Sequence, residues 1–115
     1  MGFSKYRATR VGNFASKLEK AVYETLRIME ACKEIKNIRT QTQVHLSDAK
    51  ILYKPDFEYE NCKTGETEWA EAKGVETAEW RIKRRLWIHY GPGKLNVWKG
   101  SYSKPYLHET IEVKK

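Results

Sequence analysis

Two segments decide the fold: KPDFEYE at residues 54–60 and EWAEAKG at residues 68–74. In the first, acidic and aromatic side chains alternate, and in the second two alanines alternate with tryptophan, glutamate and lysine, as in β-strands with two different faces. The polar stretch between them contains Gly65, which accepts the left-handed backbone of a tight turn. We therefore expect strands over residues 51–59 and 67–73, joined as an antiparallel hairpin.

The register of this hairpin determines whether its acidic residues meet. With a four-residue loop over residues 62–65, Asn61 pairs with Glu66, and Asp56 then lies opposite Glu71. Directly opposed residues share a face, with their Cβ atoms about 5 Å apart. A three-residue loop would shift the register by one and place the two carboxylates on opposite faces.

Opposed carboxylates carry a cost, because like charges placed opposite each other destabilise a strand pair. A divalent cation would remove the repulsion, and carboxylates, a backbone carbonyl and waters are the oxygen ligands that Mg²⁺ or Mn²⁺ accepts. Lys73 lies two residues beyond Glu71 on the same face, where it would orient an attacking water or offset charge on the pentavalent phosphorane. The alternative is a solvated sheet face on which these side chains form ordinary ion pairs.

Outward from the hairpin, residues 16–32 and 77–89 have the apolar spacing of helices, with Ser16 and Thr77 as candidate N-caps. The apolar side chains expected to pack are Leu18, Val22, Leu26 and Met29 in the first helix, and Trp80, Ile82, Leu86 and Trp87 in the second. Residues 33–40 are expected to be a connection, and further strands are expected at 41–46, 94–100 and 104–115, the last at a sheet edge. This order predicts an α/β fold, a small mixed β-sheet flanked by helices.

A chain of 115 residues fits one domain, here residues 1–115 with a basic N-terminal arm at 1–13. No apolar run approaches the ~20 residues of a membrane span, and the N-terminus lacks the apolar core of a secretory signal, so an intracellular location is expected. Cys32 and Cys62 are expected to be free thiols, and the cysteines and histidines lack zinc-site spacing.

The net charge of +7 favours a polyanionic partner, nucleic acid before an anionic membrane. The segment RIKRR at residues 81–85 sets basic residues on the second helix without interleaved acids. Such a face can follow a phosphate backbone, although a charged helix face is also an ordinary solvated surface. The residues predicted to contact DNA are Lys5, Arg7 and Arg10 in the arm, and Arg81, Lys83, Arg84 and Arg85 in the helix.

The sequence PDFEY at residues 55–59, followed by EAK at 71–73, resembles the P-D…(D/E)-x-K signature of the PD-(D/E)xK nuclease superfamily. Upstream, FASKLEK at residues 14–20 is similar to the start of the first helix in small phage-encoded members. The segment ETAEWRIKRRLW at residues 76–87 resembles the helix that follows the lysine. The similarity covers residues 14–88.

This resemblance implies a restriction-endonuclease-like core that hydrolyses DNA phosphodiester bonds with Mg²⁺ or Mn²⁺. It gives Asp56, Glu71 and Lys73 catalytic roles, adds Glu19 from the first helix as catalytic residue and metal ligand, and makes the Ala72 carbonyl a metal ligand with the two hairpin acids. Small members include homodimeric resolvases of branched DNA such as Holliday junctions, so branched DNA and a second copy are the expected partners. The expected setting is the cytoplasm of a phage-infected or prophage-carrying bacterium.

Several alternatives stay open at this point. Ser16 and Glu19 also match a capping box, in which Glu19 bonds back to the Ser16 amide and needs no metal. Glu24, one helical turn later, would then supply the acid. The domain could instead be a non-catalytic nucleic-acid-binding module, or a regulatory or structural phage protein with an acidic protein partner.

Overall fold

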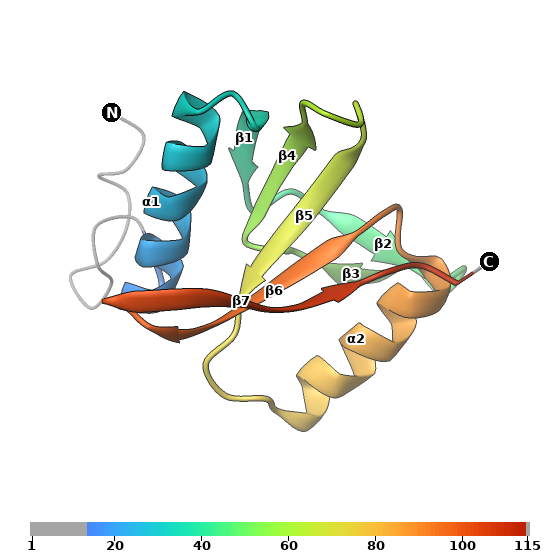
Figure 1. Ribbon diagram of the computed structural model, residues 1–115. Helices are drawn as coiled ribbons and strands as arrows, with labels where there is room; N and C mark the ends of the chain where they lie inside the picture. The colour runs from blue at the N-terminus through green and yellow to red at the C-terminus, as the bar shows by residue number, and fades with distance from the viewer. Residues whose placement is uncertain (1–13, 115) are drawn as a thin grey trace.

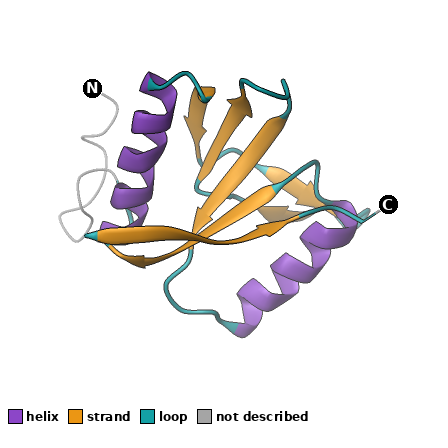
Figure 2. Cartoon of the chain, in the orientation of Figure 1, coloured by secondary structure: helices purple, strands orange, loops and turns teal. Residues whose placement is uncertain are grey.

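The computed structural model of the protein describes residues 14–114, which form a helix, a run of strands, a second helix and two final strands (Figures 1 and 2). Helix α1 spans Lys17–Ala31 and helix α2 spans Ala78–Tyr90. The strands are β1 (Ile35–Thr40), β2 (Val44–Leu46), β3 (Ile51–Tyr53), β4 (Phe57–Asn61), β5 (Thr67–Ala72), β6 (Leu95–Ser101) and β7 (Lys104–Ile111). The architecture is mixed α/β, as predicted.

The main sheet has the strand order β1-β4-β5-β6-β7, and β2 pairs with β3 in a separate two-stranded sheet. Strands β5 and β6 run parallel, with α2 as the crossover between them, while the other neighbours in the main sheet are antiparallel. Strand β7 lies at an edge, which confirms the prediction for the last strand.

Helix α1 covers one face of the main sheet. Ser16 is its N-cap, since the Ser16 hydroxyl accepts an amide hydrogen bond at 3.0 Å. Its inward stripe of Leu18, Val22 and Leu26 is buried and packs against Phe57 of β4. The sheet face under α1 therefore holds one of two hydrophobic cores.

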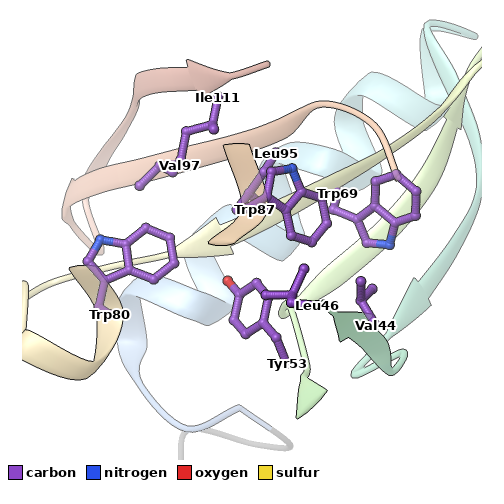
Figure 3. Close-up of a cluster of buried hydrophobic side chains, with 9 residues drawn as sticks. All are labelled: Val44, Leu46, Tyr53, Trp69, Trp80, Trp87, Leu95, Val97 and Ile111. Carbon is purple, nitrogen blue, oxygen red and sulfur yellow. The ribbon is translucent and has the colours of Figure 1, made fainter. Parts of the chain in front are cut away.

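Helix α2 covers the other face, where the core is rich in aromatic rings from α2, β3 and β5 (Figure 3). Thr77 caps the helix by accepting the Trp80 amide at 3.1 Å. Trp80 and Trp87 are buried and pack on the ring of Tyr53 from β3. The contact predicted for Ile82 is wrong, because that side chain is 59% exposed.

Residues 33–40, predicted to be a connection, contain the edge strand β1. Ile35 is buried and Ile38 half-buried, so the apolar residues are three apart and not two. Asn37 has a φ of 57°, and the pairing with β4 shifts between Lys36 and Arg39. This irregularity breaks the alternation on which strand prediction depends.

Two predicted strands are shorter than expected. Of residues 41–46, only Val44–Leu46 pair as a strand, and Gln41 has a φ of 56°. Residues 51–59 divide into β3 and β4, which belong to different sheets. Pro55 stands between them and has no amide hydrogen to continue a ladder. This break decides the geometry of the candidate site.

Three predictions concern the chain as a whole. Cys32 and Cys62 are free and exposed, as predicted. Within residues 14–114, neither helix has the length and apolar character needed to cross a membrane. The predicted basic arm, with Lys5, Arg7 and Arg10, lies outside the described residues.

Candidate active site

The β4–β5 hairpin has the register that brings its acids together. Phe57 pairs with Ala70, and the Asn61 amide donates to the Glu66 carbonyl at 2.8 Å. Gly65 closes the four-residue loop with a φ of 78°, as predicted. One position beyond the Phe57–Ala70 pair, Asp56 lies opposite Glu71.

Asp56 comes directly after buried Pro55 and just before β4, and its contacts tie it to the end of β5. Its Oδ2 accepts a hydrogen bond from the Ala72 amide at 2.8 Å. Its own amide donates to Glu71 Oε1 at 3.3 Å. On the other side, Gln41 donates from Nε2 to Asp56 Oδ1 at 3.4 Å, and from its backbone amide to the Asp56 carbonyl at 3.1 Å.

Glu71 is the buried acid of the pair, with 7% of its surface exposed. The Tyr53 hydroxyl donates to Glu71 Oε1 at 2.9 Å, and Lys73 Nζ lies 3.2 Å from Glu71 Oε2. Lys73 Nζ also lies 4.8 Å from the centre of the Trp80 ring, a cation–π contact with the first turn of α2. The predicted grouping of Asp56, Glu71 and Lys73 on one side of the hairpin is therefore present.

Glu19 is buried at the start of α1, with 8% of its surface exposed. The Ser16 hydroxyl accepts the Glu19 amide, which is one half of the predicted capping box. The other half differs, because Glu19 Oε1 accepts the amide of Ala15 at 3.3 Å and not that of Ser16. Glu24, the alternative to Glu19 as the acid from this helix, is exposed, and its Oε2 lies 4.0 Å from Lys20 Nζ.

Burial and mutual repulsion dominate the electrostatics of the site. The pKa of Asp56 lies well above its ordinary value because of burial first, then the charges of Glu71 and Glu19; the Ala72 amide and Lys73 act in the opposite direction. Burial also raises the pKa of Glu71, against the opposing effects of Lys73 and Tyr53. Asp56 thus interacts with two further acids, Glu71 and Glu19, and Lys73 offsets part of their effect.

This donor set can be compared with the needs of a metal ion. Among residues 14–114, no group of three or more aspartate, glutamate, histidine or cysteine side chains is arranged to hold one. Two adjacent carboxylates do suit a hard divalent cation, which often takes one or two carboxylates and fills its shell with waters. The Ala72 backbone lies against Asp56, so its carbonyl is a further candidate oxygen.

The basic residues of α2 divide into two groups. Lys83 donates to the Leu52 carbonyl at 3.0 Å, and Arg84 forms an ion pair with Glu109 of β7. Arg81 and Arg85 are exposed and form no ion pair within residues 14–114. An open groove of about 690 Å³ separates α2 from β7, and it is lined by Glu76, Arg81, Arg84, Arg85, Ile88, His108 and Glu109.

Sequence reasoning missed Tyr53 as a site residue. Continuous alternation over residues 51–59 predicts that Tyr53 points away from Asp56, but the break at Pro55 turns it toward Glu71. The contact of Gln41 with Asp56 depends on a left-handed backbone conformation that the sequence does not signal. His108 reaches the α2 groove from β7 without any local pattern to indicate it.

The fold and site together define a small α/β domain in which a hairpin presents two acids and a lysine beneath the start of a helix. The chain belongs to the DUF1064 family, described as a protein of unknown function, whose model matches residues 3–101. No curated protein and no solved structure matches the chain. Its chemistry is therefore inferred from the site.

Proposed function

We propose that this protein is a metal-dependent DNA endonuclease with a restriction-endonuclease-like core. The observation that carries the proposal is the opposition of Asp56 and Glu71 at the end of β5, with Lys73 Nζ 3.2 Å from Glu71. A buried acidic pair beside a lysine suits hydrolysis of a phosphodiester, because both a cation and an activated water are needed there.

In this proposal Asp56, Glu71 and the Ala72 carbonyl hold Mg²⁺ or Mn²⁺, with Glu19 as the acid from α1. When bound, such a cation polarises a phosphoryl oxygen and lowers the pKa of a bound water. The chain itself orients these ligands: Tyr53 fixes Glu71, and the Ala72 amide fixes Asp56. Hydrogen bonds of this kind set the direction of a carboxylate before any ligand arrives.

Lys73 acts as the positioning cation for the attacking water or for charge that develops on the phosphate. Its ammonium is held between Glu71 and the face of Trp80, so the lysine is oriented before substrate binds. An ammonium near the phosphate stabilises charge that grows during the reaction.

Arg81 and Arg85 are the α2 residues best placed to meet DNA phosphates, since Arg84 and Lys83 already have partners in the fold. The net charge of +7 supports an encounter with nucleic acid. Within the endonuclease proposal we favour branched DNA, such as a Holliday junction, and a homodimer, because symmetric cutting of two strands needs two sites. This last step is by analogy with small resolvases.

The main alternative is a DNA-binding module on the same fold that does not cleave. One observation that favours it is the ion pair between Lys73 and Glu71, which engages both side chains. The other is that, within residues 14–114, no three aspartate, glutamate, histidine or cysteine side chains are arranged to hold a metal. Both functions predict DNA binding, and they differ in whether a divalent ion produces cleavage.

The deciding experiment incubates the protein with a four-way junction, a flap and a plain duplex, each with Mg²⁺, Mn²⁺ or EDTA. The wild type should nick the branched substrates with either metal, while Lys73→Ala should bind them equally well without cutting. Lys63→Ala, in the exposed β4–β5 turn, is the matched control and should cut normally. Binding without cleavage by the wild type on every substrate would favour the module.

A further inference from the structure

A second pocket, of about 480 Å³, lies on the sheet face that α1 covers. Asp56 and Glu71 belong to the other side, where Glu71 bonds to Tyr53 of the α2 core. The C-terminal end of α1, the β4–β5 turn, β6 and β7 form the walls, and Met29, Trp98 and Leu107 supply apolar surface. Its size and lining fall in the range of small-molecule sites.

The polar lining of this pocket centres on a buried carboxylate. Glu68 is only 8% exposed, and the side-chain amides of Asn61 and Asn96 each donate to it at 3.1 Å. Within residues 14–114, no lysine, arginine or histidine forms an ion pair with Glu68. Buried charges in proteins are normally paired, so the charge of Glu68 lacks its usual counterpart.

The groups around Glu68 are held rigidly. Asn96 Oδ1 accepts from Thr110 Oγ1 at 2.8 Å, and Asn96 Nδ2 also donates to the Tyr59 hydroxyl at 2.8 Å. Strands β4, β5, β6 and β7 therefore each contribute a side chain to one network. Three members of this network, Tyr59, Glu68 and Asn96, line the pocket, so a ligand there would meet polar groups that are already oriented.

We propose that this pocket binds a small organic cation: a primary ammonium or guanidinium group on a short aliphatic chain. The cation would meet Glu68, and the aliphatic chain would lie along Met29, Leu107 and the Trp98 ring. The proposal does not depend on the nuclease function, since none of these residues belongs to the Asp56–Glu71 site.

The mouth of the pocket limits the charge of the ligand. Lys33, Glu34 and Lys63 line it and are exposed. Two lysines against one glutamate leave a net positive charge there, which disfavours a second positive charge on the ligand, although exposed charges are screened beyond about 10 Å at 0.1 M salt. The pocket should therefore prefer a ligand with one positive charge over a polyamine.

The test compares n-butylguanidinium with n-butylurea, which has nearly the same shape and no charge. Each is titrated into the wild type while NMR follows the Asn96 side-chain amide and the Trp98 indole N–H. The cation should give saturable shifts at both groups, with a dissociation constant at least about tenfold lower than that of the urea. Equal binding of the two ligands, or shifts at neither group, would overturn the proposal.

Three variants locate the binding. Glu68→Gln removes the charge and should abolish the preference for the cation over the urea. Leu107→Arg, at a position that is 49% exposed, keeps the network intact and places a competing guanidinium at the mouth, so it should weaken butylguanidinium binding about tenfold. Lys73→Ala should bind like the wild type. Unchanged binding in Leu107→Arg would contradict the proposal even if Glu68→Gln failed to fold.

Discussion

Asp56 and Glu71 are joined reciprocally across the β4–β5 hairpin. The Asp56 amide donates to Glu71 Oε1 at 3.3 Å, and Asp56 Oδ2 accepts the amide of Ala72, the next residue after Glu71, at 2.8 Å. The carboxylate of Glu71 thus accepts a hydrogen bond from the backbone amide of Asp56, and the carboxylate of Asp56 accepts one from the residue that follows Glu71. The hairpin keeps two buried acids together, and burial and their mutual repulsion raise the pKa of Asp56, so the site is testable by stability as well as by activity.

Mg²⁺ or Mn²⁺ should raise the melting temperature at neutral pH. A ligand at one hundred times its dissociation constant stabilises the native state by about 2.7 kcal/mol, which corresponds to a shift of several degrees in a domain of this size. Asp56→Asn should lose most of this gain, because the substitution removes one of the acids proposed to hold the metal. Thermal denaturation with and without metal measures the rise in melting temperature. Asp48→Asn, in an exposed turn, is the control. An equal gain in both variants would show binding elsewhere.

Without metal, stability should fall as pH rises above about 4, the ordinary range of an aspartate. Since the pKa of Asp56 is raised, mainly by burial and then by Glu71 and Glu19, the folded state binds more protons than the unfolded chain between the two pKa values. The contribution of Asp56 to the free energy of unfolding is therefore complete below the pKa that it has in the unfolded chain. It is lost as pH rises through the pKa that it has in the folded protein. Urea denaturation at several pH values checks this, and Asp56→Asn should show a flatter dependence.

Tyr53→Phe should destabilise the protein by about 1.5–3 kcal/mol, the usual range for a hydrogen bond to a charged group. Its hydroxyl donates to the buried carboxylate of Glu71, and this bond lowers the pKa of that acid. The pKa of Glu71 should therefore rise further in the variant, and the pH dependence of cleavage should move upward with it. Tyr90→Phe, at an exposed position at the end of α2, is the control and should change neither property.

The hairpin could be predicted from sequence because its determinants are local. Gly65 permits the left-handed turn, the four-residue loop sets the register, and that register places Asp56 opposite Glu71. The helix caps at Ser16 and Thr77 depend on neighbouring residues in the same way. The hairpin and the caps needed no knowledge of the rest of the fold, whereas the sequence left both a three-residue and a four-residue loop open.

The remainder depended on contacts between distant segments or on unusual backbone conformations. Asn37 interrupts the alternation of β1, and Pro55 divides one apparent strand into two that join different sheets. No pattern within residues 51–59 indicates that Tyr53 meets Glu71, because that contact follows from how the two sheets pack. The pairing of Arg84 with Glu109 of β7 likewise joins segments whose approach the sequence does not specify.

Arg81→Ala/Arg85→Ala should weaken DNA binding in proportion to the phosphate contacts removed. Both side chains are exposed on the groove wall without ion pairs in the described chain, whereas Arg84 is engaged by Glu109. Each lost phosphate contact reduces the slope of log K against log salt by about 0.9 on duplex DNA, so two should reduce it by about 1.8. Binding titrations in EDTA at several salt concentrations measure this without cleavage. Lys36→Ala/Lys63→Ala removes the same charge from β1 and the hairpin turn, and an equal loss of slope there would mean that net charge, and not the α2 face, governs binding.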